Sequence, residues 1–209
     1  KDFSAAIKSH KKAIEINPRY AEAYNNLGAA YGEKNDIDAS IKCYQTALHI
    51  NPDYAAPKHI LSALTGIQTT TAPREYVEAL FDAYAKNFEK SLVDELEYKI
   101  PAALVKIMTD NRSDSSLGSI LDLGCGTGLV GEAVKEFSDK IVGLDLSTAM
   151  LEQAGLKDIY DELVNIDITD YLGTADLDFD YFIASDVFIY VGSLTASFEL
   201  IRSRNKRNG

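Results

Sequence analysis

Apolar residues recur every three or four positions over residues 1–64, and this spacing predicts a series of helices. Pro18 and Pro52 interrupt the pattern, and because proline cannot continue a helix, each is expected to end one. The same spacing returns over residues 74–96 and again over residues 101–108. The first half of the chain is therefore predicted to be mainly helical.

The pattern changes at residues 119–129, which read S-I-L-D-L-G-C-G-T-G-L. Four mostly apolar residues predict a buried parallel strand, and glycines at every second position predict a turn too tight for side chains. Residues 129–137 then predict a helix whose N-terminus points at whatever the turn binds. Because Gly124, Gly126 and Gly128 let the backbone approach a ligand closely, we interpret this segment as a cofactor-binding loop.

Three further short apolar segments follow, and each ends in polar residues. The segments and the residues after them are 140–144 with Asp145, 163–166 with Asp167, and 180–184 with Ser185 and Asp186. Strands that alternate with helices form a parallel sheet whose ligands bind at the carboxyl ends of the strands. The predicted fold class is α/β, a Rossmann-like doubly wound sheet of about four strands, preceded by an all-α segment. In such folds an acid at the position of Asp145 accepts hydrogen bonds from ribose hydroxyls, and Ser147 is placed to cap the next helix.

The helical first part contains an internal repeat. A-I-E-I-N-P-R-Y-A at residues 13–21 returns as A-L-H-I-N-P-D-Y-A at residues 47–55, an offset of 34 residues, which is the period of tetratricopeptide (TPR) repeats. Seven residues match the large, small and breaker positions of that motif: Tyr24, Leu27, Gly28, Tyr31, Tyr44, Ala47 and Pro52. Ser40 stands where the motif prefers alanine. We interpret residues 1–65 as an incomplete, TPR-like helical segment.

Residues 66–73, G-I-Q-T-T-T-A-P, are typical of a linker, with small polar residues between a glycine and a proline. The predicted domains are 1–65, the linker 66–73, and 74–209. The helix over residues 74–96 is expected to break near Asn87. Its aromatic residues have two interpretations: they form core, or Tyr84 or Phe88 closes over a bound cofactor.

Charge and cysteine content narrow the choice of partners. The net charge is −11, and residues 66–209 carry 13 Lys and Arg against 25 Asp and Glu. So acidic a domain repels a polyphosphate backbone, which makes nucleic acid a poor substrate. No apolar run reaches the roughly 20 residues that span a bilayer, and Cys43 and Cys125 lack the spacing of a disulfide or metal framework. We therefore expect no nucleic acid, no membrane and no metal, and a cytoplasmic location.

Several stretches resemble the successive motifs of class I S-adenosylmethionine-dependent methyltransferases. They are L-D-L-G-C-G-T-G (121–128), G-L-D-L-S-T-A-M-L (143–151), N-I-D-I (165–168) and S-D-V-F (185–188). L-F-D-A-Y-A-K-N-F-E (80–89), Y-D-E-L (160–163) and D-V-F-I-Y (186–190) resemble more particularly the predicted methyltransferases that carry TPR repeats. The resemblance covers residues 74–209. It implies an enzyme that uses S-adenosylmethionine and releases S-adenosylhomocysteine.

The resemblance also implies roles for single residues. The methionine end of the cofactor is expected at Asp122, Gly124 and Gly126, with Cys125 between them as a small turn residue. At the adenosine end, Asp145 is expected to bind the ribose. Leu146 and Met150 are expected to pack on the faces of the adenine. Asp167 and the Ile168 amide are expected to hydrogen-bond to the edge of the adenine. Ser185 is expected near the sulfonium and the acceptor. Each acid has a structural alternative: Asp122 would stabilise the turn, Asp145 would flank a helix, and Asp167 would belong to a loop.

Asp186 and Tyr190 are the catalytic candidates, should an oxygen or nitrogen acceptor need a base; the alternative is that they form core or orient substrate. Two other functions stay open. One is a non-catalytic interaction protein whose TPR segment binds a partner while the α/β part is scaffold. The other is an NAD-binding oxidoreductase, because residues 126–131 also fit G-x-G-x-x-G.

Class I methyltransferases normally have seven strands, and four are placed here. The domain is therefore expected to be truncated before the fifth strand, which would leave the apolar residues 179–191 as a long exposed edge and the activity of the chain uncertain. We expect a second copy to cover that edge in a homodimer. The other expected partners are a small-molecule or protein methyl acceptor and a protein bound by the TPR segment.

Overall fold

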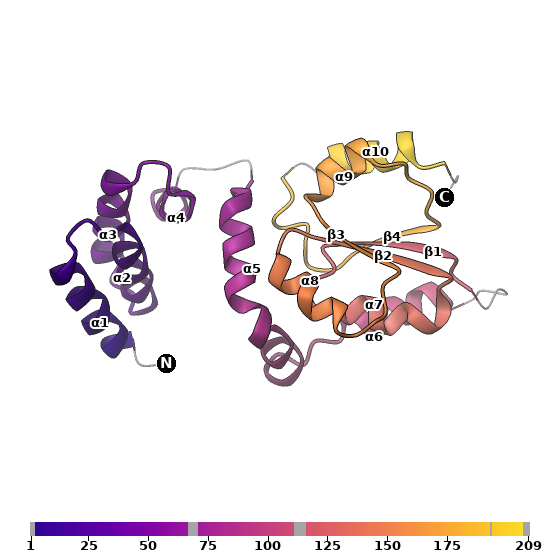
Figure 1. Cartoon of the computed structure of the whole chain (residues 1–209), viewed down its shortest axis with the longest axis horizontal. Helices are drawn as coiled ribbons and strands as arrows, with labels where there is room; N and C mark the ends of the chain where they lie inside the picture. The colour runs from indigo at the N-terminus through magenta and orange to yellow at the C-terminus, as the bar shows by residue number, and fades with distance from the viewer. Residues whose placement is uncertain (1–2, 67–70, 111–115, 193, 207–209) are drawn as a thin grey trace. The chain divides into compact units, whose positions relative to one another are not determined.

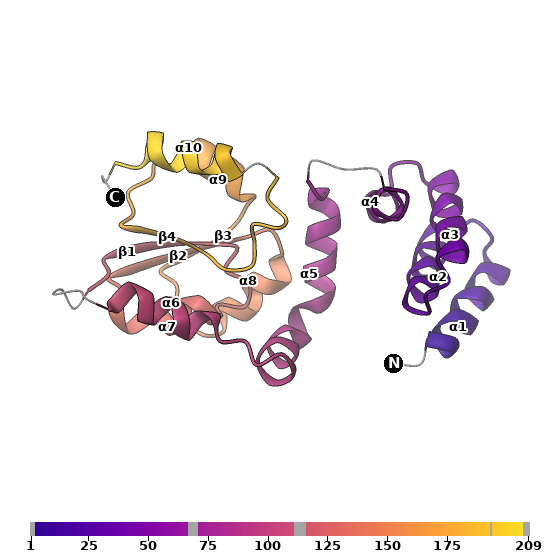
Figure 2. The same cartoon turned by 180° about the vertical axis from the view of Figure 1, so that it is seen from behind.

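The computed structural model describes residues 3–66, 71–110, 116–192 and 194–206 (Figures 1 and 2). The chain divides into two compact units, Lys1–Tyr76 and Val77–Gly209. The linker expected at residues 66–73 falls partly outside the described residues, so its bounds stay a prediction.

The first unit consists of helices, as the periodicity predicts. They are α1 (Phe3–Ile16), α2 (Ala21–Glu33), α3 (Ile37–Ile50) and α4 (Ala55–Leu64). Each helix packs on the next one along the chain, and the packing is most extensive between α2 and α3. Asp36 begins α3, where its side chain accepts a hydrogen bond from the Ala39 amide at 3.2 Å.

The contact between α2 and α3 explains both a match and a departure from the repeat motif. A methyl group on Gly28 would lie 2.9 Å from the Tyr44 ring, so only glycine lets these helices approach so closely. Ser40 is buried beside it, and its hydroxyl donates to the Gly28 carbonyl at 2.8 Å. The serine is therefore accommodated in the place of alanine because its polar atom has a partner.

The second unit is built on a parallel sheet in the order β3-β2-β1-β4, which confirms the predicted Rossmann-like class. Its strands are β1 (Ser119–Leu123), β2 (Lys140–Asp145), β3 (Glu162–Asn165) and β4 (Tyr181–Ala184). β3 begins and ends one residue before the predicted segment. Because all strands run the same way, their carboxyl ends meet at one edge of the sheet.

The helices of this unit cover both faces of the sheet. They are α5 (Arg74–Glu89), which begins in the first unit, the π-helix η1 (Lys90–Glu95), α6 (Ile100–Thr109), α7 (Leu129–Val134) with the 3-10 turn η2 (Lys135–Phe137), α8 (Thr148–Gly155), α9 (Ile168–Thr174) and α10 (Leu194–Arg204). Helices α9 and α10 lie on one face, and α6, α7 and α8 lie on the other (Figures 1 and 2).

Two apolar clusters hold the layers together. Leu121 and Leu123 point towards α9 and α10, where Leu172 and Leu177 are fully buried with them. Ile120 points to the opposite face and packs in the cluster that includes residues of α6 and α7. All five residues of β1 are buried, which accounts for its nearly continuous apolar sequence.

The helical pattern over residues 74–96 changes near the expected position: α5 ends at Glu89, two residues after Asn87, and passes directly into the π-helix η1. One expectation about this unit is wrong. The edge formed by β4 is shorter than residues 179–191, because the chain leaves the sheet after Ala184.

Among the described residues, none of the helices combines the length and hydrophobicity needed to cross a bilayer.

Candidate functional site

The carboxyl ends of the four strands bring the predicted site residues to one edge of the sheet. Leu123 at the end of β1 pairs with Leu144 in β2 and with Ala184 in β4, and Asp145 pairs with Asn165 in β3. The glycine loop, Asp145, Asp167 and Ser185 each follow or end one of these strands. The tips of the strands therefore converge as expected, and the candidate site lies above them.

The glycine loop has the tight geometry that its sequence predicts. Gly124, Gly126 and Gly128 have φ values of 73°, 54° and 89°, a region that residues with a side chain rarely adopt. A methyl group on Gly124 would lie 2.4 Å from Val187. At Gly126 the nearest atom to such a methyl group is 3.8 Å away, in the ring of Phe88. Gly126 is thus the point of the loop where a ligand can come closest to the backbone.

Asp145 links the ends of β1 and β2. Its carboxylate accepts from the Gly126 amide at 2.9 Å and from the Ser147 amide at 2.8 Å. Burial raises the pKa of Asp145, and these backbone hydrogen bonds oppose that shift. Leu146, the next residue, is half-buried. The carboxylate is held against the glycine loop, where its remaining lone pairs are available to a ligand.

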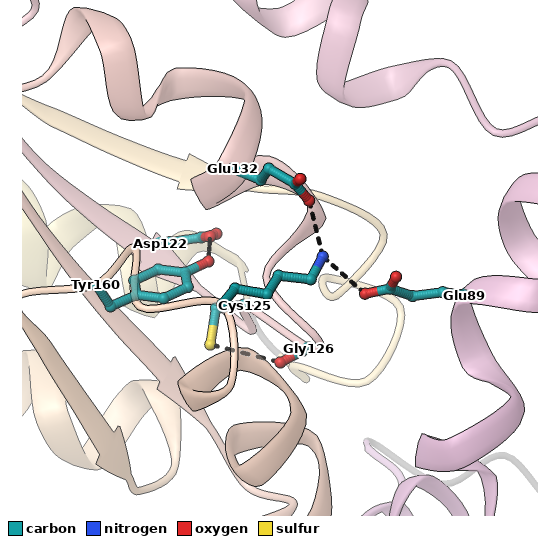
Figure 3. A network of polar contacts seen from close by, with 7 residues as sticks. Glu89, Asp122, Cys125, Gly126, Glu132 and Tyr160 are labelled. Carbon is teal, nitrogen blue, oxygen red and sulfur yellow. Dashed lines mark hydrogen bonds and ion pairs between the residues drawn. The ribbon is translucent and has the colours of Figure 1, made fainter.

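Asp122 lies beneath the loop, away from solvent. It is 1% exposed, and the Tyr160 hydroxyl donates to it at 2.7 Å (Figure 3). Burial raises the pKa of Asp122 to about 7, and the Tyr160 hydrogen bond opposes the shift. A ligand would reach this carboxylate only after the loop moved. The geometry therefore corresponds to the turn-stabilising alternative and leaves Asp122 without the direct contact to the methionine end that the resemblance implies.

Cys125 and Tyr160 pack beneath the same loop. Cys125 is 6% exposed, and burial first of all raises the pKa of its thiol well above the ordinary value. A methyl group on Gly143 would lie 2.9 Å from the Cys125 sulfur and from the Tyr160 ring alike. Cys125 is therefore a packed turn residue and not a nucleophile, as its sequence context predicts.

The residues expected around adenine differ in their access to a ligand. Met150 lies on the first turn of α8 and is 1% exposed, and its backbone amide donates to the Ser147 hydroxyl at 3.1 Å. Its contact with adenine stays a prediction. Asp167 caps α9 by accepting from the Thr169 and Asp170 amides, and Ile168 is buried as its first residue.

Ser185 and Asp186 stand at the end of β4 with Tyr98, a residue that sequence analysis did not single out. The Tyr98 and Ser185 hydroxyls share a short hydrogen bond. Burial and the neighbouring Asp186 raise the pKa of Tyr98 to about 12. Asp186 is exposed and has a φ of 54°. Tyr190 lies beyond the end of β4, and the centroid of its ring is 5.3 Å from that of Phe81 in α5.

Helix α5 lies over this edge of the sheet, and its residues Asp82 and Phe88 approach the site. Asp82 accepts from the Ser147 hydroxyl at 2.6 Å and from the Ala149 amide at 3.2 Å. Phe88 stands over Gly126 and meets the Tyr84 ring edge-on at 5.8 Å. Tyr84 itself is 39% exposed. The aromatic residues of α5 therefore lie next to the candidate site, which agrees with the covering role considered for Tyr84 and Phe88.

Ion pairs of Lys157 connect the C-terminal end of α5 to α7. Lys157 follows α8 and forms ion pairs of 2.8 Å with both Glu89 in α5 and Glu132 in α7. Figure 3 labels the two glutamates and marks both ion pairs with dashed lines. Neither Asp82 nor Lys157 carries a local sequence signal, because their partners lie in distant segments of the chain.

A separate cavity of about 440 Å³ lies at the opposite edge, by the amino ends of the strands. Its lining includes Ser119, Lys140, Glu162 and Asp180. None of the predicted site residues lines it. We therefore do not count it as part of the candidate site.

Family models match both parts of the chain. Residues 1–35 and 21–54 match models described as TPR repeat and tetratricopeptide repeat. Residues 120–209 match a model described as a methyltransferase domain. Among curated proteins, none matches the chain.

The solved structures that resemble this chain include proteins named as methyltransferases. Magnesium protoporphyrin IX methyltransferase (ChlM) from Synechocystis PCC 6803 with bound SAH has a TM-score of 0.52 and 16% identity, over 64% of this chain and 68% of that chain. The DhpI-SAH complex has a TM-score of 0.49 and 23% identity, over 63% of both chains. An S-adenosylmethionine-dependent methyltransferase from Clostridium acetobutylicum ATCC 824 has a TM-score of 0.49 and 22% identity, over 62% of this chain and 55% of that chain. The chain thus spans less than two thirds of the length of DhpI.

At these identities the similarity concerns the fold, and it agrees with the sheet order and the glycine loop described above. The family models add that residues 21–54 match a tetratricopeptide repeat and residues 120–209 match a methyltransferase domain. The chain therefore has an N-terminal segment that matches tetratricopeptide repeat models and a Rossmann-like sheet whose residues 120–209 match a methyltransferase domain model.

Proposed function

We propose that the second unit binds S-adenosylmethionine at the carboxyl edge of its sheet and transfers the methyl group to an acceptor. The observation that carries this proposal is the junction of the open Gly126 turn with the Asp145 carboxylate, which accepts from the Gly126 amide at 2.9 Å. This junction offers a close backbone approach and a hydrogen-bond acceptor side by side, which an adenosyl group with a ribose diol needs.

The residues of the site fit this cofactor in two further respects. The hydroxyl oxygen of Thr127, inside the glycine loop, is buried and has no hydrogen-bond partner within the described residues. An unpaired buried hydroxyl is costly, so a polar ligand group in the loop would relieve it. The ring of Phe88 would lie 3.8 Å from a methyl group placed on Gly126, so it would have to shift to admit the cofactor and could then shield it from water.

The bound cofactor would supply a methyl group on a positively charged sulfur: the acceptor lone pair forms the new bond to carbon, the C–S bond breaks with its electron pair left on sulfur, and the acceptor releases its proton. The chain's part is to orient the two reactants and exclude water. We assign orientation at the adenosine end to Asp145, Leu146 and the Ile168 amide, with Asp167 at the adenine edge. Asp186 and Tyr190 are proposed to orient the acceptor or take its proton.

The proposal is tested by isothermal calorimetry with S-adenosylmethionine and S-adenosylhomocysteine on the 209-residue chain. We expect both to bind and Asp145→Asn to weaken binding by about tenfold or more, because the amide loses the charge that ribose hydroxyls hydrogen-bond to. Asp176→Asn, an equal change of charge beside the remote cavity, is expected to leave affinity unchanged. Absence of binding by the unmodified chain would overturn the proposal, and a fluorescence titration with NADH then tests the oxidoreductase alternative.

The first unit suggests a second role, recognition of a protein partner, because TPR helices usually form such surfaces. We propose that residues 1–65 serve this role, that residues 66–73 act as the linker, and that the catalytic module is 74–209. Pull-down of a partner that survives Asp145→Asn would instead favour the pure scaffold function. Cys43 and Cys125 are both free thiols, which supports a reducing compartment such as the cytoplasm.

We also propose that two copies associate through the edge at β4. In the described part of the chain β4 is the last strand of the sheet, and Ile189 just beyond it is 80% exposed. Open strand edges with apolar neighbours are normally covered by another chain or element.

A further inference from the structure

We propose that Tyr98, acting with Ser185 and Asp186, makes this site prefer S-adenosylmethionine over S-adenosylhomocysteine. The inference rests on the proposed function and adds a specificity-determining residue to it. The two ligands differ by a methyl group and by the positive charge on sulfur. A site that holds a fixed negative charge near that sulfur therefore distinguishes them.

The location follows from the topology. Asp145, the proposed ribose ligand, ends β2, and the glycine loop follows β1, so the cofactor would lie across the end of β1. β4 is the neighbour of β1 on the side away from β2, with Ala184 paired to Leu123. Ser185 and Asp186 come directly after Ala184 and are thus placed at the end of the cofactor that bears the sulfur.

Tyr98 reaches this position from a distant segment. Its hydroxyl shares a hydrogen bond with the Ser185 hydroxyl although the two residues are 87 positions apart. Tyr98 is half-buried, and burial together with the adjacent Asp186 raises its pKa to about 12. The phenol therefore stays protonated near neutral pH and can act as a hydrogen-bond donor in the cluster.

The backbone on both sides of the contact is unusual. Glu97, next to Tyr98, has a φ of 50°, and Asp186 has a φ of 54°. A π-helix, η1, precedes this segment. Left-handed non-glycine residues and π-helical turns are both unfavourable, and both are enriched at functional sites. Here they turn Tyr98 and Asp186 towards each other.

The charge in the cluster comes from Asp186. Its carboxylate is exposed. The other acids described at this edge are engaged elsewhere: Asp122 is buried on Tyr160, Asp145 accepts from the glycine loop and Ser147, Asp82 accepts from Ser147, and Asp167 caps α9. Once the cofactor and α5 exclude water, a carboxylate beside a sulfonium gains much more from attraction than it does in bulk solvent. Tyr98, which interacts with Asp186 and shares a hydrogen bond with Ser185, would keep it in place.

The test is calorimetric affinity for both ligands in the full chain and in Tyr98→Phe and Asp186→Asn. Asparagine tolerates the left-handed conformation of Asp186, so the second variant removes the charge with little change of shape. We expect the ratio of the two affinities, S-adenosylmethionine over S-adenosylhomocysteine, to fall about fivefold or more in Asp186→Asn and about threefold in Tyr98→Phe. Affinity for S-adenosylhomocysteine should change less than twofold.

Tyr171→Phe is the matched control, because it removes one phenol oxygen from a half-buried tyrosine in α9 that lines the remote cavity. It should leave the ratio as in the unmodified chain, and thermal melts verify that all variants fold. If both ligands bind the unmodified chain and the ratio is the same in every variant, this inference is overturned and the proposed function stands. If the unmodified chain binds neither ligand, the proposed function fails, and the inference with it.

Discussion

Asp122 is a buried carboxyl group whose single hydrogen bond from Tyr160 does not offset the cost of burying its charged form. The carboxyl group is 1% exposed and accepts one side-chain hydrogen bond, from Tyr160. Burial raises its pKa to about 7, well above the ordinary value of 3.8. In the unfolded chain the group therefore loses its proton at lower pH than in the folded chain. Between about pH 4 and pH 7 the unfolded state binds fewer protons, so stability falls as pH rises.

We expect the free energy of unfolding of the chain to be lower at pH 8 than at pH 5, with about 2 to 3 kcal/mol of the difference due to Asp122. Asp122→Asn, which keeps an acceptor for Tyr160, should remove that part of the pH dependence. Urea unfolding at the two pH values measures it. Asp145, whose pKa is also raised, carries a like charge that interacts with Asp122, so the comparison measures the two carboxyl groups together. An equal pH dependence in the two proteins would contradict the burial argument.

Single residues of the site differ in how far the sequence could predict them. Gly126 and Asp145 follow two consecutive strands of the chain, so their proximity was predictable from the sequence. In the structure the Gly126 amide donates a hydrogen bond to Asp145. The full burial of Met150 was not predictable, because packing against distant segments decides which side of α8 is buried. Asp82 and Tyr98 gave no signal, since each meets a partner at least 65 positions away.

Helix α5 is the element that decides how the site opens. It is held by Asp82 on Ser147 at one point and by Glu89 on Lys157 at another, with Phe88 over Gly126 between them. The side chains of Lys157 and Glu89 are 21% and 40% exposed, and such partly exposed pairs contribute little to global stability. Their effect should therefore appear in the opening of α5 and hardly in the melting temperature.

We expect Lys157→Met to raise both the association and the dissociation rate of S-adenosylhomocysteine by about three- to tenfold. The reason is that the ion pair that holds α5 over the site is lost while the Gly126 turn is unchanged. Stopped-flow binding measures both rates. Lys206→Met, which breaks the exposed pair with Asp176, is the control for the change of charge and should leave them unaltered. Unchanged rates in Lys157→Met would show that α5 is not a gate.

The elements of the second unit were predicted unequally well. Strands β1 and β2 were recognisable because parallel strands buried on both faces have short, nearly continuous apolar runs, and β3 and β4 have similar short runs although they are only partly buried. Helix α9 was not singled out, and the transition from α5 to η1 was placed as a break near Asn87. A π-helical turn keeps the helical spacing of apolar residues nearly intact, so the pattern alone does not distinguish it from a regular helix.

At the scale of the whole molecule, the open edge of the sheet has consequences for association. Ile189 and Phe198 are 80% and 56% exposed, and Phe198 packs against Phe188, which follows β4. These residues extend the apolar surface next to the strand that has no further partner in the described sheet. A second copy that paired with β4 would cover both the open backbone groups and these side chains.

We expect the chain to be dimeric in light scattering coupled to size exclusion at micromolar concentration, and the double variant Ile189→Lys/Phe198→Lys to be monomeric, because charges cannot be buried in such an interface. Ile107→Lys, at a residue of α6 that is 73% exposed, controls for the loss of surface hydrophobicity and should remain dimeric. A monodisperse monomer of the unmodified chain would contradict the association through β4.

The amino-acid sequence by itself determined the local features of this protein. The offset of 34 residues sets the helical repeat, and the order of strand, glycine turn and acid sets the Rossmann-like edge, because these depend on backbone conformation and on neighbours along the chain. Only the tertiary structure decided which side chains meet above that edge. Asp82 with Ser147, Lys157 with Glu89, and Tyr98 with Ser185 are contacts between distant segments, and the packing of α5 and η1 against the sheet is what brings them together.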